Sequence, residues 1–282
     1  MNELLVKLNF LIPTLPRAEK SFAEALFENP EAVQRMTLAE IARETNSSDA
    51  SIIRFCKRLG LHGYTELKQE VALAVEEKQE DRYEEDVVES TDDIRAIMNK
   101  VFQSNVQTLQ NTMVMADEAK YLEAVEAMAK AKSIHFFGVG DAFAACQFAY
   151  MKFLRLGVRC SAHSDVMMQF MEANNLGPDD VALAVSYEGR SRNVNQAMEI
   201  AKKRGATTIC ITKMNKSPLL KHVDIPLYIS ISDLSVWRER VTRRVGDQFI
   251  LDVLYMGYIA RKPDFSRLLK KSQLAIDSNK VK

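Results

Sequence analysis

The chain has 282 residues, of which 47% are hydrophobic and 27% are charged. This composition is typical of a folded globular protein and excludes a wholly disordered chain. The 38 basic residues balance 38 acidic ones, which excludes a uniformly basic coat for nucleic acid but leaves room for a local basic face. A chain of this length holds one large domain or two of ordinary size.

The sequence predicts a cytoplasmic protein without membrane contact. Charged residues interrupt every apolar stretch well before the roughly 20 residues that a membrane span needs. Near the N-terminus, Glu3 stands where a secretion signal carries basic residues, and Pro13 cuts the apolar segment short. The four cysteines are far apart and form no CxxC pair, so we expect reduced thiols, no disulfide, no metal site and no cofactor. They are Cys56, Cys146, Cys160 and Cys210.

An acidic run divides the chain. Residues 76–93 read EEKQEDRYEEDVVESTDD, with ten acidic and two basic residues. Such a run repels itself and buries little surface, so it is typical of a linker or a solvated helix end. We therefore expect an N-terminal domain over residues 1–77, an acidic linker over 78–92 and a C-terminal domain over 93–282.

The N-terminal segment reads as helical throughout. Amphipathic patterns cover residues 4–11, 19–27, 38–44, 49–59 and 66–75. Thr37 with Glu40 forms a capping-box pattern at the start of one short helix, and Ser48 can cap the next. Two short helices joined by the tight turn at 45–47 make up a helix-turn-helix unit, so an all-α domain of this type is predicted.

The second helix of this unit has the residue types of a DNA reader. Its first turn offers short polar or small side chains that can approach base edges in a major groove: Ser48, Asp49, Ala50 and Ser51. Basic side chains that suit phosphate follow: Arg54, Lys57, Arg58 and Lys68. Because residues 1–77 carry nine basic and twelve acidic residues, any attraction to DNA must be confined to one face. The alternative is a helical cap whose charges only solvate its surface. Separately, Arg54 could pack within the unit instead of contacting phosphate.

The C-terminal segment alternates short apolar strands with helices. Strands are expected near residues 133–137, 158–161, 181–185, 207–212 and 225–231, with helices between and around them. This order predicts a three-layer α/β domain with a parallel sheet of about five strands, covered on both faces.

Two loops at strand ends are candidates for a ligand site. Gly138 and Gly140 follow the first strand and permit close backbone approach, while Ser186, Gly189 and Ser191 follow a buried strand and precede a helix. In parallel sheets, ligands bind where such loops meet, and helix N-termini favour anions. The residues alone therefore suggest a small anionic ligand.

Several segments together resemble the RpiR-type family of bacterial transcription regulators. The strings RFCKRLG at 54–60 and GYTELK at 63–68 are similar to its DNA-binding domain. From about residue 93 onward, the chain is similar to the sugar isomerase (SIS) domain that these regulators carry. Matching pieces occur in order at 134–156, 181–191, 206–212 and in the helix around 244–254.

This resemblance implies a regulator that binds double-stranded DNA at a palindromic operator and senses a phosphosugar. It also implies a homodimer or homotetramer. Two DNA-binding domains in one assembly bind DNA more tightly than one, because the second binds at a high effective concentration. The ligand-binding residues that it implies lie in the two loops: Gly138, Gly140, Asp141, Ala142, Ser186, Tyr187, Glu188, Gly189, Arg190 and Ser191.

Both loops depart from the family pattern. The first loop usually reads Gly-x-Gly-x-Ser, and here Asp141 and Ala142 fill its last two positions. The second usually reads Ser-x-Ser-Gly-x-Thr, and here Glu188 replaces a serine. Carboxylates weaken an anion site, although Arg190 and Arg192 could offset them. Three outcomes stay open: phosphate held by backbone amides, a ligand with a cationic group, or no sugar-phosphate binding.

Two other functional classes compete with a ligand-controlled regulator. An architectural DNA-binding protein would carry a degenerate SIS domain without ligand. A sugar-phosphate isomerase would need an acid–base group at the sugar, and His163 is the histidine expected near the site. We favour a regulator that is not an enzyme.

Overall fold

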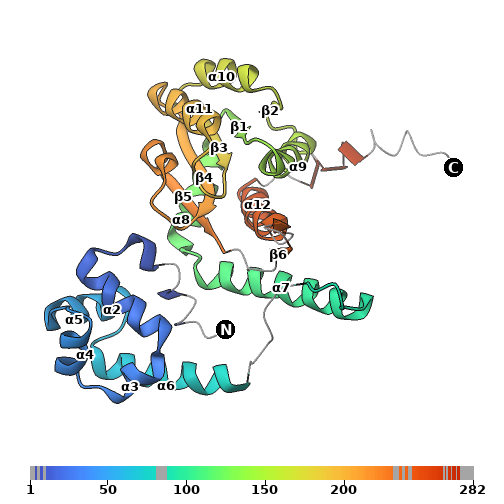
Figure 1. Ribbon diagram of the computed structural model, residues 1–282. Helices are drawn as coiled ribbons and strands as arrows, with labels where there is room; N and C mark the ends of the chain where they lie inside the picture. The colour runs from blue at the N-terminus through green and yellow to red at the C-terminus, as the bar shows by residue number, and fades with distance from the viewer. Residues whose placement is uncertain are drawn as a thin grey trace. The chain divides into compact units, whose positions relative to one another are not determined.

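The computed structural model describes residues 4, 7–8, 11–80, 88–230, 235–236, 239–240 and 243–262, and residues 264, 266–267, 269–270 and 272–273. The chain forms two compact units (Figure 1). The first holds the described residues up to Met115 together with 214–216 and 235–236, and the second holds the other described residues from Ala116 on. Half of the segment 4–11, where a first helix was predicted, lies outside the described residues, and residues 4, 7, 8 and 11 are helical.

The first unit begins with a helical head, the bundle α2–α6. A 3-10 turn, η1 (Ile12–Thr14), precedes it, and its helices are α2 (Arg17–Glu28), α3 (Pro30–Arg35), α4 (Leu38–Glu44), α5 (Asp49–Arg58) and α6 (Tyr64–Glu80). The aromatic side chains of Phe22 and Phe55 pack edge to face, with ring centroids 5.4 Å apart, and both are fully buried. This contact between α2 and α5 closes one apolar core for the head.

The predicted helix-turn-helix is confirmed as α4, a short turn and α5. Thr37 and Glu40 form the capping box, and the Ser48 hydroxyl accepts a hydrogen bond from the Ser51 amide. Asn46 takes a left-handed backbone conformation (φ 49°) in the turn between the helices, a conformation that asparagine tolerates better than most residues.

Two elements at the edges of the head differ from the sequence prediction. No helix was predicted between residues 27 and 38, but Asn29 caps α3 there, because its side chain accepts a hydrogen bond from the Ala32 amide. The other difference is that α6 continues to Glu80, into the predicted linker. Helix α7 (Ile94–Val114) belongs to the first compact unit, whereas the sequence placed residues 93–115 with the C-terminal domain.

The second unit contains the five-stranded parallel sheet that the sequence predicted. Its strands are β1 (Ser133–Phe137), β2 (Cys160–Ala162), β3 (Asp180–Val185), β4 (Thr207–Lys213) and β5 (Ile225–Ile229), in the order β2-β1-β3-β4-β5. In the register, Phe137 lies opposite Ala184, and Val185 lies opposite Ile211. The carboxyl ends of β1 and β3 are therefore neighbours at one edge of the sheet.

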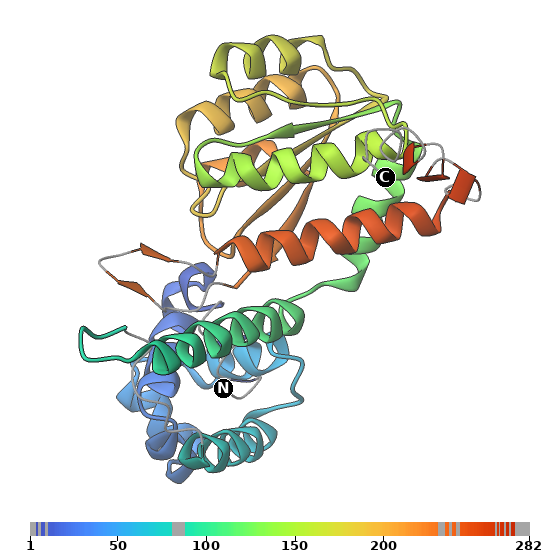
Figure 2. The ribbon, with the colours of Figure 1, turned by 90° about the vertical axis from the view of Figure 1, so that its right-hand side faces the viewer.

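Helices cover both faces of the sheet, as Figures 1 and 2 show. One face packs against α8 (Glu118–Lys130), α9 (Asp141–Arg155) and α12 (Arg243–Ala260), and the other against α10 (Val166–Asn175) and α11 (Arg192–Lys203). Alternate residues of β3 point to opposite faces: Leu183 joins the first core and Ala184 the second. This arrangement confirms the three-layer α/β prediction.

In the second half of the chain, the 3-10 turn η2 (Pro218–His222) and the two-residue strands β6 (Ser235–Val236) and β7 (Glu239–Arg240) were not predicted. None of the helices in the described part of the chain combines the length and the apolar character needed to cross a membrane.

Candidate functional site

Helix α5 presents most of its predicted DNA-facing residues to solvent. Exposed side chains come from the Ser48 cap, from the first turn and from the basic second half of the helix: Ser48, Asp49, Ala50, Arg54, Lys57 and Arg58. The apolar residues Ile52 and Phe55 point the other way and are fully buried in the head. The helix therefore separates a core face from an exposed polar and basic face.

Ser51 does not belong to the exposed face, contrary to the prediction that it contacts a base. Only 3% of the residue is exposed, and its Oγ lies 2.9 Å from Ser48 Oγ and accepts a hydrogen bond from Arg54 Nη2 at 2.9 Å. Its spacing to Ile52 and Phe55 places it on the core side of the helix. In this position Ser51 holds Arg54 rather than reaching outward.

A carboxylate that the sequence reasoning missed lies behind the arginines of α5. Glu19, on α2, accepts a hydrogen bond from Arg58 Nε at 3.1 Å, and its other oxygen lies 3.8 Å from Arg54 Nε. Glu19 is 39 residues from Arg58, so no local pattern connects the two. The alternative in which Arg54 packs inside the unit receives partial support. Its Nε lies against the buried Glu19 carboxylate, although most of the Arg54 side chain is exposed.

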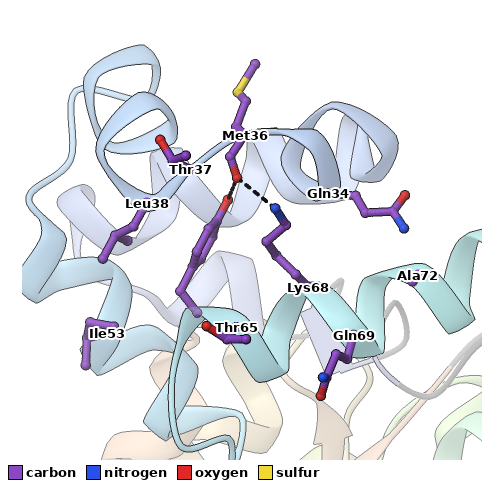
Figure 3. A pocket seen from close by; sticks show the side chains of 10 residues that line it. Gln34, Met36, Thr37, Leu38, Ile53, Thr65, Lys68, Gln69 and Ala72 are labelled. Carbon is purple, nitrogen blue, oxygen red and sulfur yellow. Dashed lines mark hydrogen bonds between the residues drawn. The ribbon is translucent and has the colours of Figure 1, made fainter.

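Lys68 lies apart from the exposed basic residues of α5. It stands on α6, and its ammonium group donates a hydrogen bond to the Met36 carbonyl at 3.2 Å (Figure 3). The hydroxyl of Tyr64 donates to Val33 and Met36 carbonyls, and burial raises the pKa of Tyr64 to about 12. Lys68 therefore serves at least to tie α6 to the α3–α4 connection.

This connection and α6 border a groove of about 740 Å³ on the head. Figure 3 shows its lining side chains from the α3–α4 region and from α6 around the Lys68–Met36 hydrogen bond. Ile53 lines it from α5. The exposed arginines of α5 are not among its lining residues.

In the second unit, seven of the predicted ligand residues line one cavity of about 260 Å³ at the carboxyl ends of β1 and β3. They are Asp141, Ala142, Ser186, Tyr187, Glu188, Arg190 and Ser191, and Val139 and Val185 complete the lining. The two loops thus converge as the sequence suggested. The three glycines, at positions 138, 140 and 189, shape the loops rather than line the cavity.

The first loop is shaped by close packing and by backbone conformation. A Cβ atom at Gly138 would lie 2.9 Å from Cys146 Sγ, so the loop passes tightly over α9. Gly140 has φ +58° and caps α9 without a side chain. The Phe143 amide donates to the Gly140 carbonyl at 3.0 Å. Because no side chain caps the helix, the amides of Asp141 and Ala142 are left for another acceptor.

The second loop is held from three sides. Ser186 N donates to the Ile211 carbonyl, and the Tyr187 carbonyl accepts from Lys213 N at 2.8 Å. The side chain of Thr212 donates to the same carbonyl at 3.1 Å. Gly189 has φ +61°, and a Cβ atom there would lie 2.3 Å from Ser217 Oγ. The loop is therefore fixed against β4 and the segment after it.

Tyr187 is anchored inward at the back of the cavity. Its hydroxyl donates a short hydrogen bond to the carboxylate of Asp247, a residue of α12 that is completely buried. These residues are 60 positions apart, so the pairing had no signal in the sequence. Tyr187 thus lines the cavity while its polar end positions the loop.

The charged residues of the cavity lie at its rim. Asp141, Glu188 and Arg190 are all exposed, whereas Ser186 and Ala142 are buried. The negative and positive side chains therefore border the opening, and the deeper part is formed by small side chains and the backbone.

Two histidines of this unit, His135 and His163, form a different cluster. Glu172 lies 2.7 Å from His135 Nδ1 and 3.3 Å from His163 Nε2, and Ser133 Oγ lies 2.7 Å from His135 Nε2. Burial lowers the pKa of His135, although the nearby Glu172 and Asp180 carboxylates oppose that shift. His163, the predicted acid–base candidate, is not among the residues that line the cavity.

Sequence comparison covers both units. The model described as "Helix-turn-helix domain, rpiR family" matches residues 2–78, and the SIS domain model matches residues 127–246. An uncharacterized HTH-type transcriptional regulator of Caldanaerobacter subterraneus is 31% identical over 282 residues, which cover 100% of this chain and 99% of that protein. The chain belongs to the RpiR family of transcription regulators. It combines a helix-turn-helix domain with an SIS domain.

Two further relatives extend this result. The regulator HexR of Pseudomonas aeruginosa is 29% identical over 96% of this chain and 94% of its own. The solved structure of the Vibrio vulnificus NanR protein complexed with ManNAc-6P has a TM-score of 0.62 and 23% identity, and covers 99% of this chain and 100% of that chain. At this identity, the NanR likeness shows the fold.

Proposed function

We propose that this RpiR-family regulator binds operator DNA through the exposed face of α5 and binds a phosphosugar in the cavity between the two loops. Residues 1–77 would form the DNA-binding domain and residues 93–282 the sensing domain, joined by the linker 78–92. The effector can change the affinity for the operator only by the factor by which its own affinity differs between the DNA-bound and the DNA-free protein. A regulator of this kind acts where the chromosome is, in the cytoplasm.

The observation that carries the effector proposal is the convergence of two helix N-termini on one cavity. Helix α9 is capped by Gly140, and α11 by Ser191 without a side-chain hydrogen bond. Six other helices of the described chain (α3, α4, α5, α7, α8 and α10) have a side chain in that role, whereas α2, which begins after Pro16, does not. Free amides and helix dipoles at one point favour an anion such as phosphate. The NanR protein, which was solved with ManNAc-6P, supports the same class of effector.

The carboxylates at the rim of the cavity are compatible with phosphate binding. Asp141 and Glu188 are exposed, so water screens their repulsion of a bound anion, and Arg190 stands in the same lining. We therefore place the phosphate deep in the loops, on the backbone amides and Ser186.

The test is a panel of sugar phosphates, amino-sugar phosphates and the matching free sugars, read by thermal unfolding of the full-length protein. A sugar phosphate is expected to raise the melting temperature, and the free sugar is not. The Glu188→Ser variant should keep or strengthen that response. If only amino-sugar phosphates act and Glu188→Ser abolishes the response, the ligand needs a cationic group. No response to any compound would favour the architectural DNA-binding protein.

The cavity offers little for isomerase chemistry. Among its described lining residues, the charged side chains are exposed at the rim, and the hydroxyl of buried Tyr187 is hydrogen-bonded to Asp247. His163 is paired with Glu172 outside that lining. Acid–base catalysis needs such a group within hydrogen-bond reach of the substrate. We therefore propose that the SIS domain senses its ligand without converting it. Turnover of a sugar phosphate by the purified protein would overturn this proposal.

A further inference from the structure

Glu19 is the buried carboxylate of the helical head. Among the described residues of the first unit, it is the one acidic side chain that is buried, with 5% of the side chain exposed. An ionised carboxylate out of water is unfavourable unless charged or hydrogen-bonding partners surround it. Its position therefore depends on the groups that face it.

Both charged partners of Glu19 come from α5. Arg58 Nε donates to Oε2 at 3.1 Å, and Arg54 Nε lies 3.8 Å from Oε1. The two arginines are four residues apart and so lie on one face of the helix. Their side chains are 63% and 50% exposed for Arg54 and Arg58, respectively. The carboxylate thus holds the inner edges of two guanidinium groups whose outer parts reach solvent.

A second contact restricts Arg54 further. Its Nη2 donates to Ser51 Oγ at 2.9 Å, and that hydroxyl lies 2.9 Å from the Ser48 cap of the same helix. Long side chains lose rotamer freedom when they bind. Arginines that are already held in one geometry lose less, and their planar groups are better able to select one base or phosphate arrangement.

The ion pairs are not needed to hold α2 against α5. The buried aromatic contact between Phe22 and Phe55 already joins these helices. Ion pairs with exposed partners contribute little to folding stability. The geometry therefore fits orientation of the arginines better than stabilisation of the bundle.

We propose that Glu19 is a positioning residue that orients Arg54 and Arg58 toward DNA and sets how strongly the regulator discriminates its operator from other sequences. This inference rests on the proposed function of α5. The same carboxylate also reduces the attraction of the head for any phosphate backbone. Its removal should therefore raise affinity for unrelated DNA while lowering discrimination.

The experiment starts from a random duplex library, from which the full-length protein selects its preferred sequence. Affinities for the enriched duplex and for a shuffled duplex of equal composition are then compared for wild type and Glu19→Gln. For Glu19→Gln, the ratio of the two affinities is expected to fall about tenfold, which is the discrimination that one base contact provides. The affinity for the shuffled duplex should rise. Glu24→Gln is the matched control, because it makes the same charge change on α2 at a side chain that is 47% exposed and paired with Lys20. It should leave the ratio unchanged.

A double-mutant cycle tests whether Glu19 acts through the arginines. In a protein that carries Arg54→Gln and Arg58→Gln, adding Glu19→Gln should change the ratio no further. If Glu19→Gln lowers the melting temperature but keeps the wild-type ratio, Glu19 is only structural and the inference is overturned. If Glu19→Gln does not fold, Glu19→Asp replaces it, and an unchanged ratio for that variant overturns the inference. If the wild type binds no DNA, the proposed function fails and this inference fails with it.

Discussion

Lys57 and Arg58 are neighbours on α5, but their surroundings differ. Arg58 is held by Glu19 at 3.1 Å, whereas exposed Lys57 has no ion-pair partner among the described residues. A lysine ammonium on a flexible stem attracts phosphate as a point charge and carries little geometric information. Lys57 is therefore expected to contribute affinity without sequence preference.

The Lys57→Ala variant should lose affinity by a similar factor on enriched and shuffled duplexes, because a phosphate is present in both. The slope of log affinity against log salt should become shallower by about one. Both are measured by fluorescence anisotropy over a salt series. Lys20→Ala, which removes a charge from α2, is the control with a smaller expected change. A loss confined to the enriched duplex would show that Lys57 reads a base instead.

The buried and half-buried thiols predict how the free energy of unfolding depends on alkaline pH. Burial raises the pKa of Cys56 and Cys160 to about 11 and that of Cys210 to about 12. In the unfolded chain these thiols ionise near pH 8.5 to 9, at roughly their reference pKa. A raised folded-state pKa contributes stability that is present below the unfolded value and is lost as pH rises toward the folded value.

The urea midpoint of the reduced protein should accordingly fall between pH 8.5 and about pH 11. Buried Tyr64 and half-buried Tyr121, whose pKa values desolvation raises to about 12, act in the same direction above about pH 10. Circular dichroism at fixed ionic strength, with a reductant present, measures the midpoint. A midpoint that rises over this range would contradict the assignment of buried, protonated thiols.

At the scale of elements, the two loops that precede α9 and α11 need glycine for different reasons. Gly140 and Gly189 both have positive φ, +58° and +61°. A Cβ atom at Gly140 would meet nothing within 4 Å, whereas one at Gly189 would lie 2.3 Å from Ser217 Oγ and 3.2 Å from Leu219 Cβ. Conformation alone constrains the first position, and conformation and packing both constrain the second.

Gly140→Ala should therefore cost about 1–2 kcal/mol of stability, the cost of a left-handed alanine. Gly189→Ala should cost more and should displace the second loop, so that the melting-temperature response to a sugar phosphate is lost. Urea unfolding and the ligand panel measure the two effects on the same preparations. Equal stability losses in the two variants would contradict the contact with Ser217.

The local rules for helix ends explain which elements the sequence predicted. The capping residues Thr37 and Ser48 mark the starts of α4 and α5, and both were identified from their side chains alone. Helix α3 was missed because its six residues are too few to show a helical period. Asn29 is both the last capping residue of α2 and the first capping residue of α3, so the end of one helix hid the start of the next.

At the scale of the whole molecule, one head offers few contacts to DNA. Exposed basic side chains on α5 are Arg54, Lys57 and Arg58, and each phosphate contact adds a limited, salt-dependent affinity. Two heads on one assembly bind with the advantage of effective concentration. A two-fold assembly also matches the symmetry of a palindromic operator.

We expect the full-length protein to be a homodimer or a homotetramer at the concentrations at which it binds its enriched duplex. Sedimentation of the free protein and of the complex measures the stoichiometry, and footprinting should show two half-sites about one helical turn apart or a multiple of that distance. A monomer that protects a single half-site with full affinity would contradict this expectation.

The sequence by itself determined the elements and their order: a helix-turn-helix followed by five parallel strands, with glycine- and serine-bearing loops after β1 and β3. These features depend on hydrophobic period, caps and turn residues, which act over a few neighbouring positions. The burial of Ser51 also had a local signal, since it is spaced with Ile52 and Phe55 on the core face of α5.

Only the tertiary structure decided which distant side chains meet. Glu19 with Arg58, Tyr187 with Asp247 and Lys68 with Met36 are separated by 39, 60 and 32 residues. Such pairs form because packing brings two faces together and a buried polar group must then find a partner. A single sequence shows that Glu19 is acidic and that Arg58 is basic, but the fold alone places one against the other.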